Sequence, residues 1–151
     1  MMADSNKLKG MARDLMISEI EEGVVVDELI DFSEKSILAR GCDPVMAIRA
    51  SDMLPALLGN PKFVSCTDDD DFLVKLQARK WSVIFFAPGA CRYSAAGVPI
   101  PGARSHTNGW SLEQYRMLVR KHQGRNIKIV ETTEEREIIP RLRSALSKAD
   151  G

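Results

Sequence analysis

Residues 81–110, WSVIFFAPGACRYSAAGVPIPGARSHTNGW, contain the pattern that decides the fold. The stretch opens with an apolar run, 82–87, whose β-branched and aromatic residues are typical of a strand buried on both faces. Pro88 and Gly89 end this strand, and a long loop, 88–110, precedes the helix that begins at Ser111. A loop of this length inside a compact domain is usually functional or disordered. Because open α/β folds bind ligands at the carboxyl edge of the sheet, we expect the functional site in this loop.

Strand and helix patterns alternate from residue 62 onward. Short apolar runs predict strands at 63–66 and 127–130 in addition to the one at 82–87. Apolar residues at helical spacing predict helices over 68–78 and 112–123, and a last helix that follows the third strand. The order βαβαβα therefore predicts right-handed crossovers and a small three-stranded, Rossmann-like parallel sheet with helices on its faces.

Two of these helices carry a predicted capping box at the amino end. Ser111 with Gln114 has the required spacing, and so does Thr132 with Glu135. Pro140 is expected to interrupt the last helix, so that 141–148 forms a segment of its own.

The chain before residue 60 has the pattern of helices only. Asp43 and Pro44 are a helix start signal, because Asp caps free N–H groups and Pro suits the first turn. Gly41 is expected to end the helix before them, and Pro55 to bend or divide the helix after them. The expected helices cover 8–20, 25–38 and 45–58. The predicted fold class is therefore α/β, with a helical N-terminal subdomain over 1–59 and an α/β subdomain over 60–151 that begins after Gly59.

The composition is that of an ordinary globular protein, with 44% hydrophobic and 28% charged residues among 151. No apolar run is long enough to span a membrane, and the N-terminus lacks the layout of a signal peptide, so we expect a cytoplasmic protein that does not bind membranes. Three cysteines without metal spacing indicate reduced thiols.

The net charge of zero conceals an uneven distribution along the chain. Residues 1–74 carry 15 acidic and 7 basic side chains, whereas 75–128 carry 10 basic side chains and one acidic side chain, Glu113. An anionic ligand would be steered towards this basic segment, which contains the long loop. The alternative is that the basic segment packs against the acidic N-terminal half.

Several other patterns carry less information about chemistry. The four aspartates at 68–71 stand where the first turn of a helix favours acids, and their spacing is not that of a calcium loop, so we expect no metal there. Cys91 lacks an arginine six positions later, as a phosphatase loop would require, because residue 97 is Gly. It also lacks a resolving cysteine, as a redox motif would require. His106 could exchange protons near neutral pH, but no partner for it is evident.

The best match to a known pattern begins at Gly89. Gly89-Ala90-Cys91, followed by Gly97-Val98-Pro99 after an apolar strand, resembles the first nucleotide-binding segment of the sirtuin family, Gly-Ala-Gly followed by Gly-Ile-Pro. The resemblance implies a Rossmann strand whose loop contacts the phosphates and the nicotinamide ribose of NAD. Gly89 and Ala90 would approach the pyrophosphate, and 97–99 would form the far side of the pocket. The family's catalytic histidine motif and zinc cysteines are absent, so deacylase chemistry is not expected.

The sequence as a whole favours a small binding domain for a phosphate-bearing, nucleotide-like ligand at this loop, with glycines admitting the backbone and arginines neutralising charge. The alternative is a non-enzymatic interaction or regulatory protein whose basic face binds an acidic protein or, less readily, nucleic acid. Exposed sheet edges and many apolar helix residues also predict a homodimer. The expected ligand-binding residues are Gly89, Ala90, Cys91, Arg92, Tyr93, Ser94, Gly97, Arg104, Ser105 and His106.

Overall fold

The computed structural model describes residues 30–90 and 99–149, and the compact unit discussed below begins at Phe32. The helix expected over 8–20 and the first part of the one expected over 25–38 lie outside the described residues. The core of the unit is a four-stranded, wholly parallel sheet with the strand order β2-β1-β3-β4. The strands are β1 (Ser36–Arg40), β2 (Lys62–Cys66), β3 (Val83–Phe86) and β4 (Lys128–Glu131).

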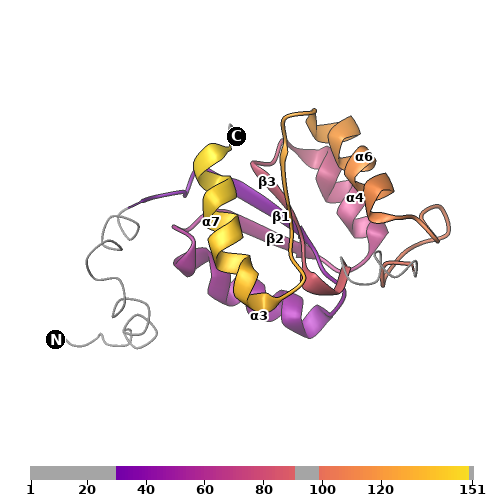
Figure 1. The fold of residues 1–151 in the computed structure, drawn as a ribbon, viewed down its shortest axis with the longest axis horizontal. Coiled ribbons are helices and arrows are strands. Elements are labelled where there is room, and N and C mark those ends of the chain that lie inside the picture. Colours follow the sequence, from indigo (N-terminus) through magenta and orange to yellow (C-terminus); the bar gives the residue numbers. More distant parts are fainter. Residues whose placement is uncertain (1–29, 91–98, 150–151) are drawn as a thin grey trace. The chain divides into compact units, whose positions relative to one another are not determined.

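Helices cover both faces of the sheet (Figure 1). One face packs against α3 (Pro44–Leu57) and α7 (Ile138–Lys148), and the other against α4 (Asp69–Ala78) and α6 (Leu112–Gln123). This is a three-layer, doubly wound α/β arrangement, so the α/β class with a parallel sheet is confirmed. None of the helices in the described part of the chain has the length and apolarity that a membrane span requires.

The number of strands was wrong, because β1 comes from residues that were expected to end a helix. All five residues of β1 are buried, with Ile37 and Ala39 in the core below α3 and α7 and Leu38 in the core below α4 and α6. A short apolar run fits a buried strand as well as a helix end, and here the register with both neighbours, β2 and β3, decides in favour of the strand. Gly41 therefore ends a strand and not a helix.

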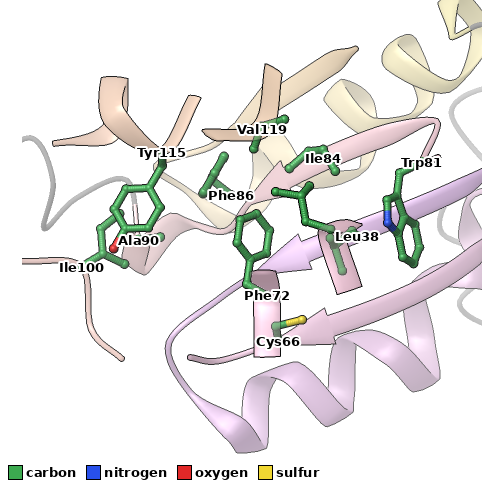
Figure 2. Packing of buried hydrophobic residues seen from close by; sticks show 11 residues of the cluster. Leu38, Cys66, Phe72, Trp81, Ile84, Phe86, Ala90, Ile100, Tyr115 and Val119 are labelled. Carbon is green, nitrogen blue, oxygen red and sulfur yellow. The ribbon is translucent and has the colours of Figure 1, made fainter. Parts of the chain in front are cut away.

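The core below α4 and α6 is built around aromatic rings. Figure 2 shows Phe72, Phe86 and Tyr115 between the sheet and these two helices. The ring centroid of Phe86 lies 5.9 Å from that of Phe72 and 6.2 Å from that of Tyr115, in tilted and edge-on geometries that aromatic pairs prefer. These contacts fix α4 and α6 to the central strands.

Local start signals predicted the amino ends of two helices correctly. The Asp43 carboxylate accepts a hydrogen bond from the Val45 N–H at 2.9 Å, and Ser111 with Gln114 forms the complete capping box of α6. Pro55 does not divide α3, because it lies near the carboxyl end of one continuous helix.

The expected start of the last helix was wrong by a few residues. The carboxylate that accepts from the N–H groups of Thr133 and Glu134 belongs to Glu137, not to Glu135. A short 3-10 turn, η1 (Glu135–Glu137), leads directly into α7, so Pro140 lies in the first turn of that helix and does not interrupt it.

Candidate functional site

The centre of the sheet contains a topological switch point at the carboxyl ends of β1 and β3. The two strands are adjacent, with Arg40 in register with Phe86. The chain leaves β1 for α3 on one face of the sheet, and after β3 it continues to α6 on the other face. Because the connections diverge, a crevice forms between them, and this is where doubly wound sheets bind ligands.

A cleft of about 310 Å³ lies beside this switch point, on the face covered by α3 and α7. Its floor comes from β1, β2 and β3, and its walls come from α3 and from the start of α7. Most of the lining is apolar. The lining residues are Ala39, Gly41, Cys42, Asp43, Met46, Ala47, Ala50, Leu54, Phe63, Ser65, Phe85, Ala87, Pro88, Gly89, Glu135 and Ile138.

Cys42 and Gly89 bring the two diverging loops together at one end of the cleft. A Cβ atom on Gly89 would stand less than 3.0 Å from the Cys42 sulfur, a separation that real Cβ atoms essentially never show. Residues 88–90, expected as part of the loop, form a helical turn after β3, and the missing side chain of Gly89 lets this turn approach the half-buried Cys42 thiol without displacing it.

The cleft has few polar side chains, and those that carry a charge are all negative. Of the lining residues that the structure describes, Asp43 and Glu135 are the charged ones, and both are acidic. The Ser65 hydroxyl lies 3.2 Å from the Ser51 hydroxyl and donates to the Ala47 carbonyl at 3.5 Å, so it is engaged with α3. The cleft thus offers an apolar body with hydrogen-bond acceptors at its rim.

A buried ion pair occupies the same end of the sheet on the opposite face. The Arg40 side chain is fully buried, and its Nε donates to Oδ1 of Asp69 at 2.8 Å. The guanidinium also donates to the carbonyl oxygens of Gly41 and of Pro101, the latter at 2.8 Å. All three guanidinium nitrogens therefore have acceptors, as a buried charge requires.

Two hydroxyl groups complete this network around Asp69. Its Oδ2 accepts from the Thr107 hydroxyl at 2.5 Å and from the Tyr115 hydroxyl at 2.6 Å. Burial, together with the hydrogen bond to Asp69, raises the pKa of Tyr115, so the phenol stays protonated and acts as a donor. The network joins the end of β1, the start of α4, the loop residue Thr107 and α6.

Gly102 allows the loop to approach this network. The Asp69 N–H donates to the Gly102 carbonyl at 3.1 Å, and Gly102 has a φ of 81°, in the left-handed region. A Cβ atom there would collide with the Thr67 carbonyl oxygen. The segment 99–110 is therefore held against the sheet by backbone and buried side-chain contacts.

The expected site residues that the structure describes have different surroundings. Gly89 lines the cleft, Ala90 is buried in the core below α4 and α6, and Ser105 and His106 are exposed. Arg104 forms ion pairs with Asp68 at 3.6 Å and Asp70 at 3.3 Å. The remaining ones, Cys91, Arg92, Tyr93, Ser94 and Gly97, lie outside the described residues.

Three residues of this region, Arg40, Cys42 and Asp69, were not recognised from the sequence. A usable signal existed for Arg40, because a charged residue next to a buried apolar run needs a buried partner. In the sequence, Asp69 has the same helix-dipole pattern as its neighbours, and the long loop favours Cys91 over Cys42 as a candidate.

The aspartates at 68–71 have separate structural roles. Asp68 caps α4 through the Asp71 N–H at 2.9 Å, and this hydrogen bond holds the pKa of the Asp68 carboxyl below its usual value. Asp69 pairs with Arg40, and Asp71 pairs with Lys75 at 2.8 Å. Within 30–90 and 99–149, no group of three or more His, Cys, Asp or Glu side chains is placed to hold a metal ion.

Comparisons of the chain with protein-family models, with curated proteins and with solved structures find no match. The functional argument therefore rests on the geometry of the cleft and on the residues around it.

Proposed function

We propose that the protein binds a small phosphate-bearing, nucleotide-like ligand at the switch point, with the ring of the ligand in the cleft between α3 and α7. The observation that carries the proposal is the cleft itself, an apolar hollow of about 310 Å³ at the carboxyl ends of β1 and β3. Its volume lies at the lower end of the range of about 300–1,000 Å³ that is usual for small-molecule sites.

The lining suits a planar apolar ring with polar substituents. Phe85 and Ala39 provide an apolar floor, and Met46 has an unbranched, flexible side chain that adapts to the shape of a ligand. The carboxylates of Asp43 and Glu135 accept hydrogen bonds, so they suit hydroxyl or amine donors on a ligand. They also disfavour a phosphate inside the cleft, so the phosphate belongs outside it, beside the loop after β3.

Arg92 is the side chain to which we assign the phosphate. It follows Gly89 by three residues, in the segment whose sequence resembles the nucleotide-binding loop of the sirtuin family. A guanidinium offers paired donors that match phosphate oxygens. Arg104 would have to leave Asp68 and Asp70 to reach a ligand, so it contributes less to the proposal.

The alternative, a nucleic-acid surface on the basic face of α6, has weaker support. Arg116 is held by Glu131 at 2.5 Å and by Glu113 at 2.8 Å. Tyr115 is buried, and the Trp110 ring packs edge-on against it with centroids 5.3 Å apart. Neither ring therefore provides the exposed stacking platform that single-stranded nucleic acid requires.

Isothermal titration calorimetry tests the proposal with AMP, NAD, adenosine and inorganic phosphate as probes. We expect a nucleotide to bind, and adenosine to bind about ten- to a hundredfold more weakly, because a charge-assisted hydrogen bond contributes about 1.5–3 kcal/mol. Arg92→Ala should cause a similar loss. The surface control Arg125→Ala should have a small effect that disappears with added salt.

A pair of alanines on α3 tests the location of the site. Ala50 lines the cleft, whereas Ala56 is exposed on the same helix. Ala50→Phe should fill the cleft and abolish binding, while Ala56→Phe should leave it unchanged, with folding checked by thermal unfolding. Absence of binding by every probe contradicts the proposed function, and unimpaired binding by Ala50→Phe contradicts the proposed location.

A further inference from the structure

We propose that the Thr132 hydroxyl is a further ligand-binding group of the cleft, and that it selects a ligand whose ring is a heterocycle with a hydrogen-bond acceptor at its edge. This inference rests on the proposed function, because it concerns the same cleft. It assigns a polar contact on the α7 side, where the lining described above is mostly apolar. The argument begins with a buried side chain whose hydrogen-bonding group is unused.

The Thr132 side chain is fully buried. Among the residues whose positions the structure describes, its hydroxyl is the one buried side-chain oxygen or nitrogen without a hydrogen-bond partner. The buried hydroxyls of Ser82 and Thr107, in contrast, both have partners. Because the large majority of buried polar side-chain atoms in proteins are hydrogen-bonded, an exception needs an explanation, and binding of a ligand is one that can be tested.

The start of α7 does not use this hydroxyl. Thr132 and Glu135 have the spacing of a capping box, but the Thr133 N–H donates to the Glu137 carboxylate at 2.9 Å instead. The main chain of Thr132 is engaged, because its N–H donates to the Phe86 carbonyl at 3.3 Å. The backbone of this residue is therefore fixed to the sheet, while its side-chain hydroxyl remains available.

Alternation along β4 directs the Thr132 side chain to the face of the sheet that holds the cleft. Val130 belongs to the core below α3 and α7, and the Glu131 carboxylate is held by Arg116 of α6 on the other face. Successive side chains of a strand point to opposite faces, so Thr132 shares the face of Val130.

The position of Thr132 in the sheet is next to the floor of the cleft. Phe86 of β3 and Glu131 of β4 are in register. The residues that follow them, Ala87 and Thr132, are therefore neighbours on the same face. Ala87 lines the cleft. Because adjacent strands are about 4.8 Å apart, the Thr132 side chain is one strand spacing away from the cleft floor.

The turn η1, which follows Thr132, leads into the α7 side of the cleft. Glu135 of this turn and Ile138 of α7 line the cleft there. None of the three residues of η1 is buried, so the turn can shift without exposing core side chains. A shift of this turn opens the path from the cleft to the Thr132 hydroxyl.

The polar groups around the cleft then define the ring of the ligand. The carboxylates of Asp43 and Glu135 only accept hydrogen bonds, whereas a threonine hydroxyl can also donate one. Thr132 therefore adds a donor on the α7 side, which a ring nitrogen or a ring carbonyl would accept. A ring whose edge is wholly apolar would leave the hydroxyl without a partner, so the cleft favours a heterocycle.

Isothermal titration calorimetry with AMP and NAD as probes measures this contact. Thr132→Val removes the hydroxyl and keeps the branched shape, so it should weaken nucleotide binding about tenfold, as expected for the loss of one hydrogen bond. Thr132→Ser keeps the hydroxyl and should bind as the natural chain does. Thr133→Val is the matched control, because Thr133 is exposed and its backbone N–H makes the 2.9 Å bond to Glu137.

The outcomes separate this inference from the proposed function. Binding by Thr132→Val that equals binding by the natural chain overturns the inference and leaves the proposed function standing. A natural chain that binds neither AMP nor NAD overturns both.

The melting temperature of the free protein gives a second readout, which involves no ligand. Thr132→Val should leave the melting temperature unchanged or raise it, because an unpaired buried hydroxyl is replaced by an apolar group of the same shape. A decrease larger than that of Thr133→Val would show that the hydroxyl already has a hydrogen-bond partner in the free protein, and this result overturns the inference.

Discussion

The close approach of Gly102 to the sheet yields the sharpest stability prediction. Gly102→Ala places a Cβ atom against the Thr67 carbonyl oxygen and also forces alanine into the left-handed region. The backbone conformation alone costs about 1–2 kcal/mol. Relieving the collision requires the loop to move, which breaks the Asp69 N–H bond to Gly102 and weakens the Arg40 bond to Pro101. Overpacking of this kind adds about 1–3 kcal/mol, so the total is about 2–5 kcal/mol.

Gly109 in the same loop is the matched control. Its φ of 83° is nearly that of Gly102, but a Cβ atom there would have no neighbour within 4 Å. Gly109→Ala should therefore cost only the backbone part, about 1–2 kcal/mol. Urea unfolding followed by tryptophan fluorescence measures both variants. A difference between them of less than about 0.5 kcal/mol would refute the reasoning that 99–110 docks tightly through Gly102.

Three further predictions concern the buried polar groups and the thiols. Asp69→Ala leaves the Arg40 guanidinium buried without a counter-charge, so it should lower the free energy of unfolding in urea by about 3–5 kcal/mol. A decrease no larger than the ~1 kcal/mol expected for a surface ion pair would show that the network is not stabilising. Burial raises the pKa of the Cys66 thiol to about 12, from 9.0, so the unfolded chain ionises first and stability should fall as the pH rises from 9 towards 12. The free energy of unfolding of Cys66→Ala should fall less steeply with pH over that interval. Equal slopes for the variant and the natural chain would contradict the assignment of the pH dependence to the Cys66 thiol. Gly89→Ala should lower the melting temperature of the natural chain but not that of a Cys42→Ala variant, because the colliding sulfur is absent there. Equal decreases in melting temperature in both backgrounds would exclude a contact between residue 89 and the Cys42 sulfur.

Local patterns in the sequence were sufficient for much of the fold. The apolar run before Pro88 predicted the strand β3, and the caps at Asp43 and Ser111 were correct because they depend on contacts within a few residues. β1 was missed because its short apolar run fits a strand or a helix end, and only pairing with two distant strands distinguishes them.

The candidate site could be predicted only in part. The carboxyl end of β3 was expected as the site, and Gly89 lines the cleft there. The cleft itself arises where α3 and the start of α7 meet, which no local pattern encodes. The Arg40–Asp69 pair joins residues 29 positions apart, so neither residue signals the other in the sequence. The ion pairs of Arg104 with Asp68 and Asp70 join different elements, so the sequence did not indicate them.

The most direct test of the central claim is a titration of the isotopically labelled protein with AMP, followed by amide chemical shifts in proton–nitrogen NMR spectra. The account predicts the largest shift changes at the amides around the cleft, Gly41, Cys42, Ala47 and Gly89. Shift changes confined to the basic end of α6, around Arg120 and Lys121, with none around the cleft, would contradict it.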